Sequence, residues 1–99
     1  MNMQAMIRQA QNLQKEMLKA QETINNMKFN SENGLVKVTM NGNRKLEKID
    51  IVKQDILEKD DIEMLEDMIV IAVNDALAQI DKATEEKLGK YTKGIPGLF

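Results

Sequence analysis

The sequence contains neither cysteine nor histidine among its 99 residues. Without cysteine there is no disulfide and no thiolate chemistry, and without histidine the commonest metal ligand and general base is missing. Zinc motifs and nucleophile–histidine pairs are therefore excluded. Ser31 is the only serine, and there is no glycine-rich phosphate loop. We predict no catalytic residue, no bound metal and no cofactor, and hence no enzyme.

Aromatic residues are scarce as well, with no Trp, one Tyr and two Phe against eight Met. The core is therefore predicted to be aliphatic and rich in methionine. No apolar run approaches the roughly 18 residues of a membrane span, and the N-terminus lacks a signal-peptide core. We expect a soluble cytoplasmic protein with a single domain over residues 1–99. A chain of this length buries only about two-thirds of its surface, so oligomerisation would help to stabilise it.

Positive charge is lacking overall, since the net charge is −2, but the two signs are separated along the chain. Residues 1–28 and 82–99 each carry a net +2, whereas residues 47–75 carry −7. A protein with this distribution can bind phosphates with its ends while its middle repels them. The alternative interpretation is that these charges form ordinary solvated helix faces.

Residues 35–52 have the pattern of a β-hairpin. Val36, Val38 and Met40 alternate with more polar positions, as in a half-buried strand. The following Asn41-Gly42-Asn43 supplies residues that tolerate positive φ and so predicts the reversal. The second strand, residues 44–52, has imperfect alternation.

A β-bulge or register shift near Glu47-Lys48 explains that imperfect alternation. Residues 27–29 are compatible with a short edge strand before a turn-rich stretch at residues 30–34. We therefore predict a three-stranded antiparallel sheet over residues 29–53. One hairpin is only marginally stable in water, so helices or a second copy must cover it.

A long helix is predicted from about Asn2 to Met27, forming an arm over residues 1–28. Its apolar positions recur at alternating spacings of three and four, the a/d pattern of a coiled coil. The helix is longer than the hairpin can cover. Its outer part should therefore project into solvent or pack on another helix, and the two alternatives are compatible.

A second helix is predicted over residues 61–88, with Asp60 as N-cap and Glu63 completing a capping box. Capping and the helix dipole explain the acidic cluster at its start without a metal. Gly89 is the expected stop, and residues 89–99 are expected to form a mobile tail.

Residues 68–73 are apolar on every side of this helix, which a two-layer monomer cannot bury completely. A symmetry mate is the simplest cover, so we predict a homodimer. The predicted interface combines the hairpin with this segment: Met40, Ile49, Ile51, Met68, Val70 and Ile71.

The order and spacing of several short blocks over nearly the whole chain resemble the YbaB/EbfC family of bacterial nucleoid-associated proteins. These blocks are Arg8–Gln11, Gln14–Met17, Gly34–Gly42, Ile49–Ile51, Glu63–Asp67, Val73–Ala76 and Gly94–Phe99. The resemblance implies an α+β fold, a tweezer-shaped homodimer and DNA binding by helical arms. It also implies a place in the nucleoid, and it leaves DNA replication or repair proteins open as further partners.

The cationic side chains of the two arms are the candidate phosphate contacts. They are Arg8, Lys15, Lys19, Lys82, Lys87, Lys90 and Lys93. The sequence offers no aromatic platform for single strands, so duplex DNA is the expected ligand. The alternative is a scaffold or adaptor dimer that uses the methionine-rich heptad surface and the apolar tail.

Overall fold

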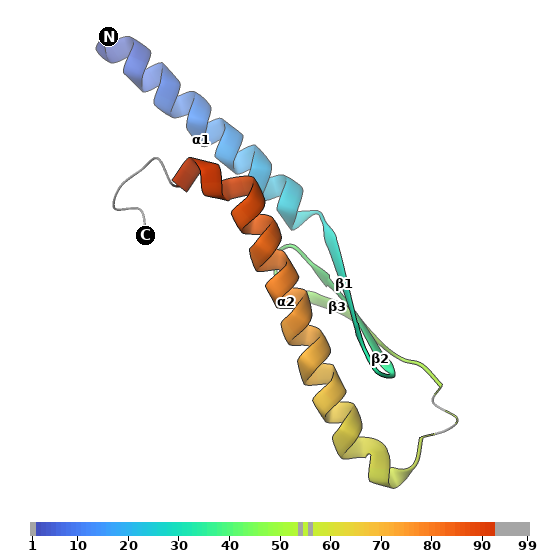
Figure 1. Ribbon diagram of the computed structural model, residues 1–99. Helices are drawn as coiled ribbons and strands as arrows, with labels where there is room; N and C mark the ends of the chain where they lie inside the picture. The colour runs from blue at the N-terminus through green and yellow to red at the C-terminus, as the bar shows by residue number, and fades with distance from the viewer. Residues whose placement is uncertain (1, 54, 56, 93–99) are drawn as a thin grey trace.

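The computed structural model describes residues 2–53, 55 and 57–92, and it has the α+β architecture that the sequence predicts. The molecule is long and thin, with extents of 70 × 22 × 14 Å (Figure 1). A helix at each end of the chain flanks one antiparallel sheet. The elements in order are α1 (Met3–Asn25), β1 (Lys28–Asn33), β2 (Val36–Asn41), β3 (Leu46–Ile51), η2 (Lys59–Asp61) and α2 (Ile62–Thr92).

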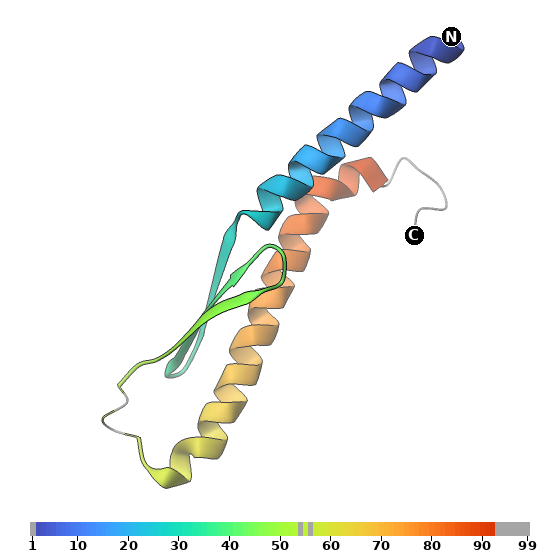
Figure 2. The same cartoon turned by 180° about the vertical axis from the view of Figure 1, so that it is seen from behind.

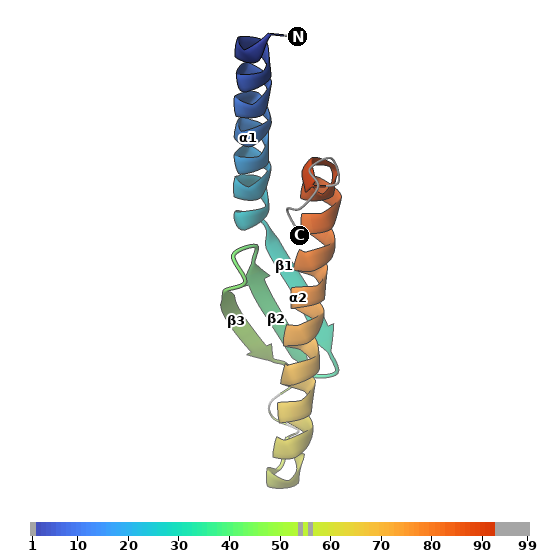
Figure 3. The ribbon, with the colours of Figure 1, turned by 90° about the vertical axis from the view of Figure 1, so that its left-hand side faces the viewer.

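The core lies between α2 and one face of the sheet, whose strand order is β1-β2-β3. The alternating residues Val36, Val38 and Met40 are all buried, as their spacing predicts. Ala72 and Ala76 face them from α2, and their small side chains allow the helix to lie close to the sheet. Figure 3 shows that α2 lies over the β1 side of the sheet and leaves β3 farthest away.

The predicted irregularity in the second strand of the hairpin is confirmed. Thr39 pairs with Lys48 while Met40 pairs with Leu46, so Glu47 is an extra residue on β3. The Glu47 carboxylate accepts a hydrogen bond of 2.5 Å from Lys28 Nζ. A bulge therefore restores the apolar face that the alternation alone would have lost.

β1 is longer than the predicted edge strand at residues 27–29, because it runs to Asn33 through residues that suggest a turn. The physical reason is tertiary contact with α2. Ser31 Oγ donates to Asp75 Oδ2 at 2.8 Å, and Gln79 Nε2 donates to the Asn30 carbonyl oxygen at 3.0 Å. These bonds hold a polar segment extended along the sheet.

The turn between β2 and β3 also differs from the prediction. The residue with positive φ is Arg44, at 67°, and not one of residues 41–43. Gly42 is required for a different reason, since a Cβ there would overlap the carbonyl oxygen of Ile24 at the end of α1. The Gly42 amide donates to the Met27 carbonyl oxygen at 3.1 Å. Glycine thus permits close approach between the turn and α1.

α1 begins and ends close to the predicted positions. The Asn2 side chain accepts a hydrogen bond of 2.7 Å from the Ala5 amide, which caps the helix. Only Ile24 is fully buried in this helix, and Met17 and Ala20 are half-buried. The preceding turns extend beyond the rest of the molecule, as Figures 1 and 2 show. The outer part of α1 is therefore a projecting arm within the described protomer.

Both ends of α2 differ from the predicted boundaries. Instead of an Asp60 cap, the chain enters through η2, and the Asp61 carboxylate accepts a 2.9 Å hydrogen bond from the Glu58 amide. At the other end the helix continues past Gly89 to Thr92. A glycine inside a helix costs only about 1 kcal/mol. The half-buried Tyr91 that follows it lies across a groove from α1. The rest of the predicted tail, residues 93–99, lies outside the described residues.

Candidate functional site

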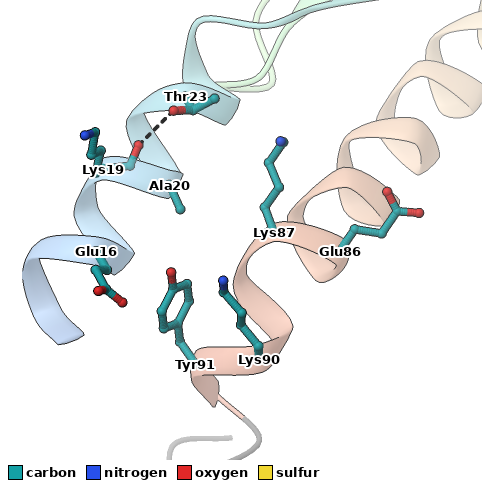
Figure 4. Close-up of a pocket in the computed structure, with 8 residues that line it drawn as sticks. All are labelled: Glu16, Lys19, Ala20, Thr23, Glu86, Lys87, Lys90 and Tyr91. Atoms are coloured by element: carbon teal, nitrogen blue, oxygen red, sulfur yellow. Dashed lines mark hydrogen bonds between the residues drawn. The ribbon is translucent and has the colours of Figure 1, made fainter.

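The last turns of α2 lie beside the second half of α1, and a groove of about 490 Å³ separates them. The groove is the place where the two predicted arms meet (Figure 4). Its lining residues are Glu16, Lys19, Ala20 and Thr23 from α1, with Glu86, Lys87, Lys90 and Tyr91 from α2. Three lysines against two glutamates make this groove weakly cationic.

The side chains in the groove do not all point the same way. Lys87 and Lys90 extend into the space between the helices, whereas Lys19 and Glu86 turn outward (Figure 4). Lys90 Nζ lies 5.0 Å from the centroid of the Tyr91 ring, a cation–π distance. Two ammonium groups therefore face the groove against one carboxylate, that of Glu16, which leaves the groove able to attract an anion (Figure 4).

The candidate cations on α1 form a line that starts near the free end of the helix and reaches the edge of the groove at Lys19. Arg8, Lys15 and Lys19 are spaced seven and four residues apart, so they form one line on the helix surface. All three are exposed, and the structure gives none of them an ion pair with a described residue. They are thus available to an external anion.

On α2, Lys82 lines a second shallow hollow together with Glu85, Glu86 and Lys90. Lys93, the last predicted contact, lies outside the described residues. The acidic residues of η2 and the start of α2 occupy the opposite end of the long molecule (Figure 1). Charge separation along the chain therefore becomes charge separation along the molecular axis.

The predicted dimer-interface residues do not form one surface. Met40 is only 2% exposed, because its side chain belongs to the core between β2 and α2. It must be removed from the predicted interface, since no second copy can reach it while the protomer is folded. Met68 is half-buried against the same core, and its sulfur accepts a hydrogen bond of 3.5 Å from the Leu35 amide.

The apolar face of β3 is open in the protomer. Ile51 and Ile49 are paired with Val36 and Val38, so they lie on the same side of the sheet as the core. Ile49 is nevertheless 40% exposed, because α2 packs over β1 and β2. The part of the sheet's apolar face that lies on β3 is therefore left for another molecule to cover.

Two side-chain contacts made by α2, one to the β2–β3 turn and one to β1, show which side of this helix faces β3. Asp81 forms an ion pair with Arg44 in the β2–β3 turn, while Asp75 bonds to Ser31 of β1. Val70, Leu77 and Asp81 are spaced seven and four residues apart, so they lie on the same side of α2. Ile71 lies one turn before Asp75 and therefore on the side of α2 that carries Asp75. The exposed Val70 thus flanks the open face of β3, and the exposed Ile71 lies on the other flank.

The pKa of Asp75, at the contact between β1 and α2, is lowered. Hydrogen bonds from Ser31 and then from Gln79 stabilise its ionised form and hold the pKa of its carboxyl below the ordinary value of 3.8. The arrangement joins β1 to α2 and has the features of a structural link. It does not indicate acid–base chemistry.

Tyr91 and Ala20 were not predicted as parts of the site. The signal for Tyr91 is present in the sequence, because Ile80, Ala83, Lys87 and Tyr91 follow one another at helical spacings. Because the helix is predicted to end at Gly89, Tyr91 is assigned to the tail and not to this helical face. The spacing of Ala20 assigns it to the heptad stripe, whereas its place in the groove depends on where α2 ends.

The described part of the chain offers no cluster of three or more metal-ligating side chains. Among the described helices, none combines the length and apolarity needed to cross a membrane.

Comparison with known proteins gives a consistent result. The model of the YbaB/EbfC DNA-binding family matches residues 1–95. A nucleoid-associated protein of Enterococcus faecalis is 50% identical over 98% of this chain and 94% of its own length. Another, from Lactococcus lactis subsp. lactis, is 53% identical over 97% of this chain and 98% of its own.

The fold is shared with a crystal structure of an uncharacterized protein from Helicobacter pylori. The TM-score is 0.71 at 20% identity, over 87% of this chain and 91% of that one. The match to the family model extends over nearly the whole sequence, including both arms and the sheet. The chain therefore belongs to the YbaB/EbfC DNA-binding family.

Proposed function

We propose that this protein binds duplex DNA in the cytoplasmic nucleoid as a homodimer, through phosphate contacts made by its helical arms. The observation that carries the proposal is the separation of charge along the 70 Å axis. Exposed cations gather on α1 and the end of α2, and acids gather at the far end. Such a molecule presents one end to a polyanion and keeps the other away from it.

The family gives independent support for DNA as the ligand. The matched family is described as DNA-binding, and the two relatives are named nucleoid-associated proteins. A net charge of −2 remains compatible with this ligand, because attraction to phosphates depends on the local potential at the arms. The modest number of cations predicts strong dependence on salt.

The homodimer is supported by the open apolar face of β3 and the neighbouring flank of α2. Ile49, Ile51 and Val70 continue the core surface of the protomer beyond the edge of α2. A second copy related by a twofold axis would cover this surface with an identical one. It would also double the arms, so that two sets of cations act on one duplex.

The test changes the sign of the cationic line on α1. The double variant Lys15→Glu with Lys19→Glu should weaken binding to two unrelated duplexes about equally, because phosphate contacts carry no sequence information. If each dimer neutralises about four to six phosphates, the wild-type slope of log affinity against log salt is about −4 to −5. Gel shifts over a salt series measure both quantities.

The matched control is Lys53→Glu with Lys59→Glu, which makes the same charge change at the acidic end. This variant should bind like the wild type, and circular dichroism should show that both variants are folded. Unchanged affinity in the α1 variant, or a wild-type slope near zero, would refute phosphate binding by the arms. The adaptor function, including contacts with replication or repair proteins, would then become the better hypothesis.

A further inference from the structure

The cationic line on α1 contains one uncharged amide side chain, that of Asn12. The spacing from Arg8 to Asn12 is four residues, and Lys15 and Lys19 follow at steps of three and four. The four side chains therefore share one face of the helix, and all of them are exposed. A group that can both donate and accept hydrogen bonds thus lies between cations that can only donate.

Asn12 is the one residue in this part of the chain that local helix formation does not favour. Every other residue from 8 to 22 is Ala, Leu, Met, Gln, Glu, Lys or Arg, the strongest helix formers, whereas Asn favours caps and turns. Its amide makes no hydrogen bond to another described residue, unlike Asn2, which caps the helix, and Gln21, which donates to Asn25. No contact within the described protomer therefore compensates for an Asn in the helix interior.

The turns of α1 around Asn12 are free of the rest of the protomer. Residues 2–16 are all exposed, and this part of α1 extends past the end of α2 (Figures 1 and 2). An α-helix with its side chains is about 10–12 Å across, which matches the major groove of duplex DNA at about 12 Å and exceeds the minor groove at about 6 Å. Residues 3–16, about 20 Å of helix, can therefore enter the major groove without displacing another element.

We infer that these free turns lie in the major groove, where Asn12 recognises an adenine. The inference rests on the proposed binding of duplex DNA. The Asn12 amide nitrogen donates to adenine N7, and the amide oxygen accepts from the N6 amino group, which is a bidentate pairing specific to this base. Arg8 and Lys15 on either side hold the helix in place through phosphates, and the amide adds the sequence information that phosphate contacts lack.

The test compares a duplex made only of A·T pairs with a copy in which 7-deazaadenine replaces every adenine. This replacement removes the N7 acceptor from the major groove and leaves the base pairing and the minor groove unchanged. The wild type should bind the adenine duplex more tightly, by about fivefold or more. Asn12→Ala should bind both duplexes equally. Its slope of log affinity against log salt should stay that of the wild type, because no charge is lost.

Gln14→Ala is the matched control, because it removes an exposed amide from the same turn of α1 on a different face. It should retain the wild-type preference, and circular dichroism should show that both variants are folded. Equal binding of the two duplexes by the wild type, or an unchanged preference in Asn12→Ala, would overturn this inference and leave phosphate binding intact. A wild type that binds neither duplex would overturn the proposed function as well, so the two failures are distinguishable.

Discussion

Gly42 lies where the β2–β3 turn meets the last turn of α1, and its backbone is buried there. Its lack of a side chain is a packing requirement, because the adjacent atoms belong to the backbone of Ile24 and Asn25 and cannot rotate away. The sequence marks this glycine as a turn residue, but only the tertiary structure shows what a methyl group would meet.

Gly42→Ala should therefore destabilise the protein by about 2 kcal/mol or more, through forced displacement of the backbone. In a domain of this size that lowers Tm by about 8 °C or more. Gly89→Ala is the control, since a Cβ there lies 3.7 Å from Glu85 Cγ in ordinary contact. It should raise stability by about 0.5–1 kcal/mol. Equal effects of the two changes on thermal unfolding would contradict this account.

Ionisation of Asp75 should make the stability of the fold depend on pH in the acidic range. Its pKa is lowered in the folded state, so the ionised carboxyl stabilises the fold above the ordinary value of 3.8. This stabilisation is lost as the pH falls through the lower folded value. Asp75→Asn should lower the free energy of unfolding at neutral pH, and the difference from wild type should shrink below pH 3.8. Urea titrations between pH 7 and pH 3 measure it; a constant difference would show that the ionised form is not preferred.

At the scale of elements, α1 is docked by its last turns alone. Ile24 is its only fully buried residue, whereas Leu18 is 64% exposed. Ile24→Ala should therefore cost about 2–5 kcal/mol, because it leaves a cavity at the single attachment point. Leu18→Ala should change stability by less than about 0.5 kcal/mol. Urea unfolding followed by circular dichroism compares the two, and a similar loss in both would mean that the outer turns are also packed.

The elements themselves were largely predictable. The heptad spacing located α1, and the alternation of Val36, Val38 and Met40 located β2 and its buried face. The predicted element boundaries differ from the structure where the local propensity of the residues favours one conformation and their tertiary contacts favour another. Residues 30–33 have turn propensity, yet bonds to Asp75 and Gln79 keep them in β1. Gly89 has stop propensity, yet α2 continues through it to Thr92 and places Tyr91 at the groove that faces α1.

At the scale of the whole molecule, the proposed homodimer interface depends on one flank of α2. Val70→Asp should prevent dimer formation, because it would bury an unpaired charge in the proposed interface. Ile71→Asp should be tolerated, since that side chain lies on the flank that faces β1. Light scattering at micromolar concentration measures the masses. A folded wild-type monomer, or loss of the dimer in Ile71→Asp alone, would contradict this interface.

The sequence by itself determined the class of the protein: a short α+β chain with a heptad helix and cations at both ends. These properties follow from residue types and local spacing, which do not depend on distant contacts. The site depended on the tertiary structure. Only the path of α2 decides that Met40 is core, that β3 is left open, and that Lys87 and Lys90 meet α1 across a groove. Those facts arise from the relative placement of segments far apart in the chain, which periodicity within a segment cannot specify.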